Sequence, residues 1–291
     1  MKPKNSSHPS APARAVESHY VHIGSAYAAG GSFTRVGSSI AIDVPIPTVA
    51  SVELPRVGGL STIKTPKWSL DCSKVQFAPM EKAKLAKLRQ TKLIDIASAT
   101  ATCKALPDVP DQPRRSFVSV EAKGVRVDGG FSLKSGKLNL QSVHARDERH
   151  PRITFGPTEL TGLKLGKLGV NVEFDLEAFK KFSTLEMLEA ALKRKDKGIS
   201  ARVAASFLRR NDGSLYRNAE GYAIGSIVKS ITGVPKEWIE QDGYTISWPG
   251  FGKVILGEIL ISDNIRRATL IRIKHSDIEI LGGLDGGSSW P

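Results

Sequence analysis

Apolar and polar residues alternate along most of the segment from Arg115 to Asp175, and this pattern constrains the fold more than any other feature of the sequence. Successive side chains of a β-strand point to opposite faces, so a two-residue period gathers apolar side chains on one face. Asp128-Gly129, a dipeptide typical of hairpin turns, interrupts the alternation. The segment therefore predicts an antiparallel meander with one dry face. Its apolar positions include Val118, Val120, Ala122, Val125, Val127, Leu138, Leu140, Val143, Leu163, Leu165, Leu168, Val170, Val172 and Phe174.

A helical period replaces this alternation from Asp175 to Lys197, and residues 199–208 could continue as helix. Ser183 and Glu186 have the spacing of a capping box, which marks a helix start. Strand-like segments return between Tyr222 and Leu281. We therefore predict a mainly β protein, either a β-sandwich or a large curved antiparallel sheet, with a helical insertion at residues 176–208. The residues on one face of the predicted helix are Leu185, Leu188, Ala191 and Leu192.

The composition changes along the chain and suggests three regions. Residues 1–36 read as a flexible N-terminal arm, residues 37–281 as the β-rich body, and residues 282–291 as a Gly-rich tail. A proline-rich loop at residues 107–115 is a candidate boundary within the body. Prolines at 45 and 47 predict edge strands or extended arms, because proline cannot donate to a strand ladder. A short basic helix is predicted from Pro79 to Gln90.

The chain is basic, with 42 Lys and Arg against 29 Asp and Glu and a formal net charge of +13. A charge of this size favours acidic partners but does not bear on the fold. The basic residues are dispersed along the sequence. In the strand-like segment that ends near Lys274, Arg272 and Lys274 are expected on one face with Leu270, opposite Ile271 and Ile273. The residues predicted to contact a polyanion are Arg266, Arg267, Arg272, Lys274, Lys193 and Arg194.

No stretch of the sequence predicts a membrane-spanning helix or a secretory signal. The longest aliphatic run, Val254 to Ile261, is short and contains Glu258. We therefore expect a cytoplasmic protein. The two cysteines, Cys72 and Cys103, have the spacing of neither a metal site nor a redox pair. Two buried thiols or one disulfide between neighbouring strands both fit the sequence.

The sequence contains no motif that specifies a reaction. Neither a G-x-S-x-G elbow nor a phosphate-binding glycine loop is present, and no two histidines have the i, i+4 spacing of a helical metal site. His144 and His150 flank a charged segment that reads as a solvated hairpin tip. We therefore expect no enzymatic activity, no catalytic residue, no metal and no cofactor.

Three classes of function are compatible with these features. The favoured one is a structural or self-associating homo-oligomer, such as a shell, filament or scaffold subunit, joined through its arm and edge strands. The second is a basic binding module for polyanions, either nucleic acid or acidic polysaccharide. The third is a carrier that holds an apolar ligand within a curved sheet.

Overall fold

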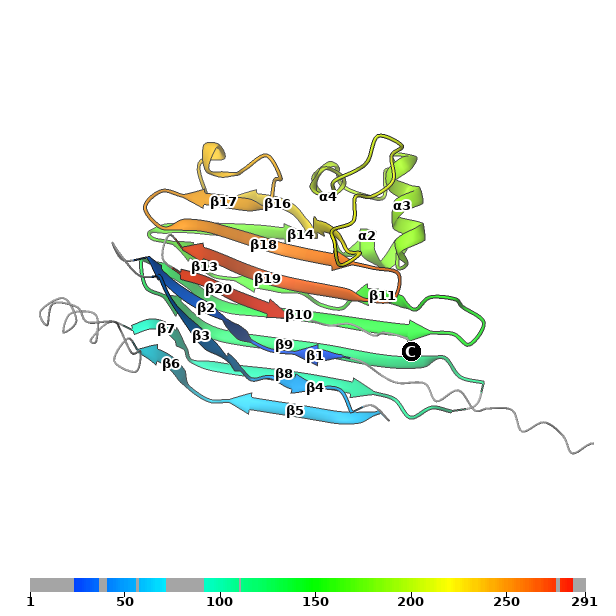
Figure 1. Ribbon diagram of the computed structural model, residues 1–291, viewed down its shortest axis with the longest axis horizontal. Coiled ribbons are helices and arrows are strands. Elements are labelled where there is room, and N and C mark those ends of the chain that lie inside the picture. The colour runs from blue at the N-terminus through cyan, green and yellow to red at the C-terminus, as the bar shows by residue number, and fades with distance from the viewer. Residues whose placement is uncertain are drawn as a thin grey trace, which may run out of the picture.

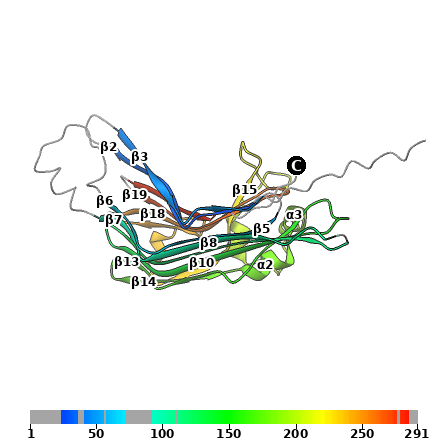
Figure 2. The same ribbon diagram turned by 90° about the horizontal axis from the view of Figure 1, so that it is seen from below.

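The structure is a computed structural model that describes residues 24–36, 41–55, 58–71, 92–109, 111–275 and 278–284. Antiparallel strands make up most of these residues, and the helices lie mainly in one insertion, so the predicted fold class is confirmed. Two sheets form two layers (Figures 1 and 2). The predicted helix at Pro79 to Gln90, Cys72, and the histidines at 8, 19 and 22 lie outside the described residues.

The larger sheet has eleven strands within the described residues. Its centre is the pair of long strands β9 (Arg114–Val127) and β10 (Phe131–His144). On one side the order continues through β13 (Leu163–Leu165), β14 (Leu168–Phe174) and β16 (Val228–Thr232). The remaining strands are β5 (Gly59–Thr65), β6 (Trp68–Asp71), β7 (Lys92–Ile96), β8 (Ser98–Ala105), β11 (Arg152–Phe155) and β12 (Glu159–Thr161).

The smaller sheet has seven strands within the described residues and joins distant parts of the chain. Its strands are β15 (Ala223–Ser226), β18 (Gly252–Ile261), β19 (Arg266–His275), β20 (Ile278–Leu284), β2 (Ala29–Val36), β3 (Ala41–Val49) and β17 (Thr245–Trp248). β2 pairs with β20, so that Gly30 is opposite Leu281. A separate short ladder joins β1 (Ser25–Ala26) to β4 (Val52–Glu53).

The β9–β10 hairpin confirms the predicted turn and most of the predicted alternation. Gly129 and Gly130 have φ of 88° and 102°, and Oδ1 of Asp128 accepts a hydrogen bond from the Gly129 amide at 3.0 Å. The inward positions change phase between Ala122 and Val125, where Gly124 has φ of 61°. Glycine adopts this left-handed backbone conformation at little cost. The strand can therefore change phase here and continue with valines on its buried face.

The hydrophobic core lies between the two sheets. Figure 2 shows them as stacked layers, with β2 and β3 rising away from the layer that contains β13 and β14. The layers approach closely at Gly136 of β10, where an added Cβ would lie 3.1 Å from Cδ2 of Leu270 on β19. Because glycine has no side chain, the opposing leucine packs directly on the β10 backbone. The structure is therefore a β-sandwich whose sheets diverge at one end.

The helical insertion consists of α2 (Leu176–Lys181), α3 (Leu185–Lys193) and α4 (Ala201–Ser206). α2 ends at its C-cap Phe182 and α3 begins at Leu185, so two helices occupy the helical region predicted from Asp175 to Lys197. The N-cap of α3 is Thr184 and not Ser183, because Oγ1 of Thr184 accepts the hydrogen bond from the Met187 amide at 3.2 Å. The predicted apolar face of this helix is buried. A 3₁₀ helix, η2 (Lys236–Trp238), precedes β17.

Regular strands extend into two segments that were predicted to be an arm and a tail. Residues 25–36, assigned to a flexible arm, contain β1 and β2 and contribute to two ladders. Residues 282–284, assigned to the tail, end β20. The proline-rich loop at 107–115 connects β8 to β9, which are neighbours in one sheet. β2 and β20 also pair with each other across most of the chain, and local composition does not reveal such a partner.

Candidate functional site

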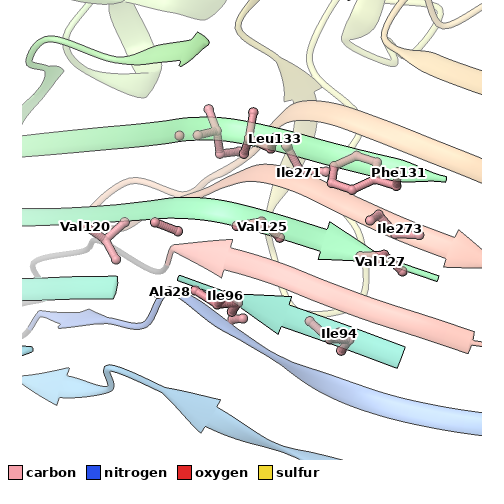
Figure 3. A pocket seen from close by; sticks show the side chains of 14 residues that line it. Ala28, Ile94, Ile96, Val120, Val125, Val127, Phe131, Leu133, Ile271 and Ile273 are labelled. Atoms are coloured by element: carbon pink, nitrogen blue, oxygen red, sulfur yellow. The ribbon is translucent and has the colours of Figure 1, made fainter. Parts of the chain in front are cut away.

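The candidate site is an apolar pocket between the two sheets (Figure 3). One wall comes from β7, β9 and β10 of the larger sheet, and the other from β19 of the smaller sheet together with Ala28 and Ala29. Every residue that lines it is aliphatic, aromatic or glycine. The side chains that define its shape are Ile94, Val120, Val127, Phe131, Leu133 and Ile273.

Small residues at the meeting point of the sheets create this pocket. Ala28, Ala29, Ala122 and Gly136 all line it, and none of them reaches across the gap between the layers. The resulting cavity has a volume of about 70 Å³. Protein interiors are normally close-packed, so an apolar space of this size is a local departure from full packing. The alternation of the strands places the valines and isoleucines there, and the small residues leave the space between them.

The chemistry available in this pocket is limited to apolar contact. No titratable or hydrogen-bonding side chain lines it, so its walls supply no general acid, general base or nucleophile. Cavities lined only by such groups stay dry and take up apolar molecules. The pocket is therefore suited to a hydrocarbon group.

The buried ionisable groups lie elsewhere. Glu258 of β18 pairs with Arg272 of β19, and burial raises the pKa of the Glu258 carboxyl. Burial also raises the pKa of the nearby Tyr244 hydroxyl to about 12. None of the three lines the pocket. This ion pair links two neighbouring strands within the protein.

The six predicted polyanion contacts do not form one surface. Arg266 is buried, with 1% of its surface exposed, so a surface ligand does not reach it. Arg267 lies over the Tyr222 ring, Arg272 pairs with Glu258, and Lys274 is exposed. Lys193 and Arg194 are exposed at the end of α3. Sequence spacing placed four of these on one strand but gave no indication of their different environments.

The prediction of which β19 side chains share a face is only partly correct. Ile271 and Ile273 are buried while Lys274 is exposed, as predicted. Leu270 is buried with the isoleucines and lines the pocket, so its predicted place beside Arg272 and Lys274 is wrong. The β19–β20 register shifts between Ala268 and Ile271, and this irregularity breaks the strict two-residue period.

Other chemistry-bearing residues have structural surroundings. Cys103 is a free thiol that is buried in β8, and burial raises its pKa to about 12, which leaves it protonated and unreactive. Nε2 of His144 lies 2.8 Å from the Glu148 carbonyl, and Nδ1 of His150 lies 2.7 Å from Oδ1 of Asn264.

Within the described ranges, no three His, Cys, Asp or Glu side chains are arranged to hold a metal ion. The described helices include none that is long and apolar enough to cross a membrane.

Residues 19–262 match the family described as a domain of unknown function (DUF8256), and the chain belongs to this family. Neither a curated protein nor a solved structure matches the chain.

Proposed function

We propose that the protein binds an apolar ligand between its two sheets and acts as its carrier. The observation that supports this function is the pocket of Figure 3, which is lined entirely by apolar residues and retains about 70 Å³ of space. Binding sites for small molecules are typically concave and mostly apolar. An empty apolar space destabilises a fold, and a ligand that fills it restores the lost contacts.

The apolar lining restricts the ligand to molecules that carry a hydrocarbon group. A polar group inside would lose its hydrogen bonds to water and gain none from the walls, which is costly. The inserted part is therefore a hydrocarbon, and any polar end stays at the mouth. Each buried methylene contributes about 0.8 kcal/mol, so a few inserted methylenes provide measurable affinity.

The test is isothermal titration of the full chain with 1-octanol. Wild-type protein should bind it, and Ala122→Val, which places two more methyl groups in the pocket, should weaken binding about tenfold or more. Thr100→Val is the matched control, because Thr100 lies on the same sheet, on the opposite face from the buried Ala99 and Ala101. It should bind octanol like the wild type. Absence of binding to wild type, or unchanged binding by Ala122→Val, would reject the carrier function.

A second candidate is self-association through the edge of the larger sheet. β5 pairs with β8 on one side only, within the described residues, and exposes two large apolar side chains. Leu60 is 65% exposed and Ile63 is 42% exposed. Unpaired strand edges are templates for pairing with another chain, and exposed apolar residues add to that tendency.

Light scattering at low and high salt tests this second candidate. The wild-type protein should have a mass in solution above that of a monomer at both salt concentrations. Leu60→Lys should reduce this mass, because it adds charge at the edge of β5. Leu208→Lys is the control, since Leu208 is equally exposed at 65% but lies after α4 and outside the sheet. A monomeric wild type, or equal effects of both variants, would exclude association through β5.

A further inference from the structure

A polar groove lies between the β10–β11 connection and the helices α2 and α3. It has a volume of about 650 Å³ and is separate from the apolar pocket. Arg149 and Arg152 line one side, and Lys180 and Lys181 of α2 line the other. Two carboxylates, Glu148 and Glu186, also line it, so cations outnumber carboxylates in the groove wall.

Three of the four groove cations form exposed ion pairs, and Nζ of Lys181 also lies 5.0 Å from the centroid of the Phe182 ring. Nζ of Lys180 pairs with Glu177 at 2.6 Å, but both side chains are more than half exposed. Nζ of Lys181 pairs with Asp196 at 3.2 Å, and Arg152 pairs with Glu148. Exposed ion pairs of this kind contribute little free energy, so a multivalent anion can compete for them. Arg149 has no ion-pair partner among the described residues.

The start of α3 also faces this groove. Ser183 and the N-cap Thr184 both line it, and α3 extends over nine residues. Thr184 already caps the Met187 amide, but the other first-turn amides of a helix lack partners within the helix, and the helix dipole makes this end positive. The amides and the side-chain cations therefore favour the same sign of ligand charge.

A buried cation lies behind the same wall. Nη2 of Arg266 donates to the carbonyl of Phe182 at 3.1 Å, and Phe182 directly precedes Ser183. The Arg266 side chain is fully buried, and its Nη1 has no hydrogen-bond partner. Desolvation lowers the pKa of this guanidinium to about 9, which leaves it charged at neutral pH. The guanidinium also lies 5.9 Å from the centroid of the Phe179 ring, and a charge in a low-dielectric interior acts over a longer range than one in water.

We infer that this groove binds a small multivalent anion of the phosphate type. Arg149 and Lys180 contact the anion from opposite walls, and the amides at the start of α3 can donate to its oxygens. Arg266 does not touch the anion but raises the positive potential at the groove wall. This site is independent of the apolar pocket and of the carrier function.

The test is isothermal titration of the full chain with inorganic pyrophosphate at low salt. The double variant Arg149→Ala/Lys180→Ala should bind about tenfold more weakly than wild type, because two charge-assisted contacts are removed. The matched control is Lys193→Ala/Arg194→Ala, which removes the same charge from the far end of α3. It should retain wild-type affinity. All four residues are exposed, so both variants should fold.

Arg266→Met provides an independent readout, because it leaves every groove-lining side chain unchanged. It should weaken pyrophosphate binding, though less than the double variant. Equal loss in the two double variants would show a general charge effect and overturn the proposed site. Absence of pyrophosphate binding to wild type would overturn it as well.

Discussion

The ring of Phe207 packs directly on Gly225. A Cβ added at Gly225 in β15 would lie 2.5 Å from Cε1 of Phe207, the residue that ends α4. This contact fixes the distance between the helical insertion and the smaller sheet. Only a residue without a side chain allows so close an approach.

Gly225→Ala should therefore destabilise the fold by about 1–3 kcal/mol, because the methyl group forces the ring or the strand to move. Urea unfolding followed by circular dichroism measures the effect. Gly169→Ala is the control, since an added Cβ there meets no atom within 4 Å. Phe207→Leu should reduce the cost of Gly225→Ala in a double-mutant cycle. Additive effects of the two substitutions would contradict a direct steric clash.

Ala122→Val should raise the free energy of unfolding of the ligand-free protein by about 0.5–2 kcal/mol. The added methyl groups fill space that apolar side chains leave open between the sheets. The same urea titration measures this change. A loss of stability would show that the pocket is already filled or that its walls do not yield.

Arg266→Met should leave the free energy of unfolding at neutral pH unchanged or raise it by up to about 4 kcal/mol. The substitution removes a buried charge that has no carboxylate partner among the described residues, and methionine is an unbranched side chain that packs well. It also removes the hydrogen bond to Phe182, which limits the gain. A clear loss of stability in thermal and urea unfolding would show that the guanidinium's contacts outweigh its desolvation.

The stability of the protein should depend on pH through Glu258. Desolvation raises the pKa of its carboxyl above the ordinary value of 4.5, against the opposing effects of Arg272 and Lys274. The native state thus holds a proton that the unfolded state has already released. The contribution is fully present below pH 4.5 and is lost as the pH rises through the native-state pKa.

Unfolding free energies of wild type and Glu258→Gln, measured from about pH 4 to pH 8, isolate this contribution. The difference, wild type minus variant, should fall as the pH rises. A difference that increases with pH would mean that the pairing with Arg272 dominates over desolvation.

Much of the fold could be predicted because it is encoded locally. The alternation from Val118 to Ala122 and the Asp128-Gly129 turn were sufficient to predict the central hairpin. The same approach failed where the buried residues are polar. Ser142 and His144 continue the inward face of β10, whereas Val143, which looked like a core residue, is less buried. Hydrophobicity alone could not distinguish these positions, because strand parity decided which face they occupy.

The candidate sites depended on tertiary structure and could be predicted only in outline. An apolar cavity was one expected consequence of a curved sheet, but its position follows from Ala122 and Gly136 facing β19 across the core. No local sequence pattern indicates which residues face each other across the core or how closely they approach. The groove combines residues near 150 with residues near 180, and the sequence pattern predicts only a solvated tip for the first group. Arg266 was expected on a surface, because an arginine is rarely buried without a partner.

The pairing of β2 with β20 has a consequence for how the protein is made. Gly30 and Leu281 are opposite each other in the same ladder, so the smaller sheet cannot close until the ribosome has released almost all of the described chain. The central hairpin needs only neighbouring residues and can form during synthesis. Until β20 arrives, β2 has no partner on that side, and newly made chains should be most prone to mispairing with each other during this interval.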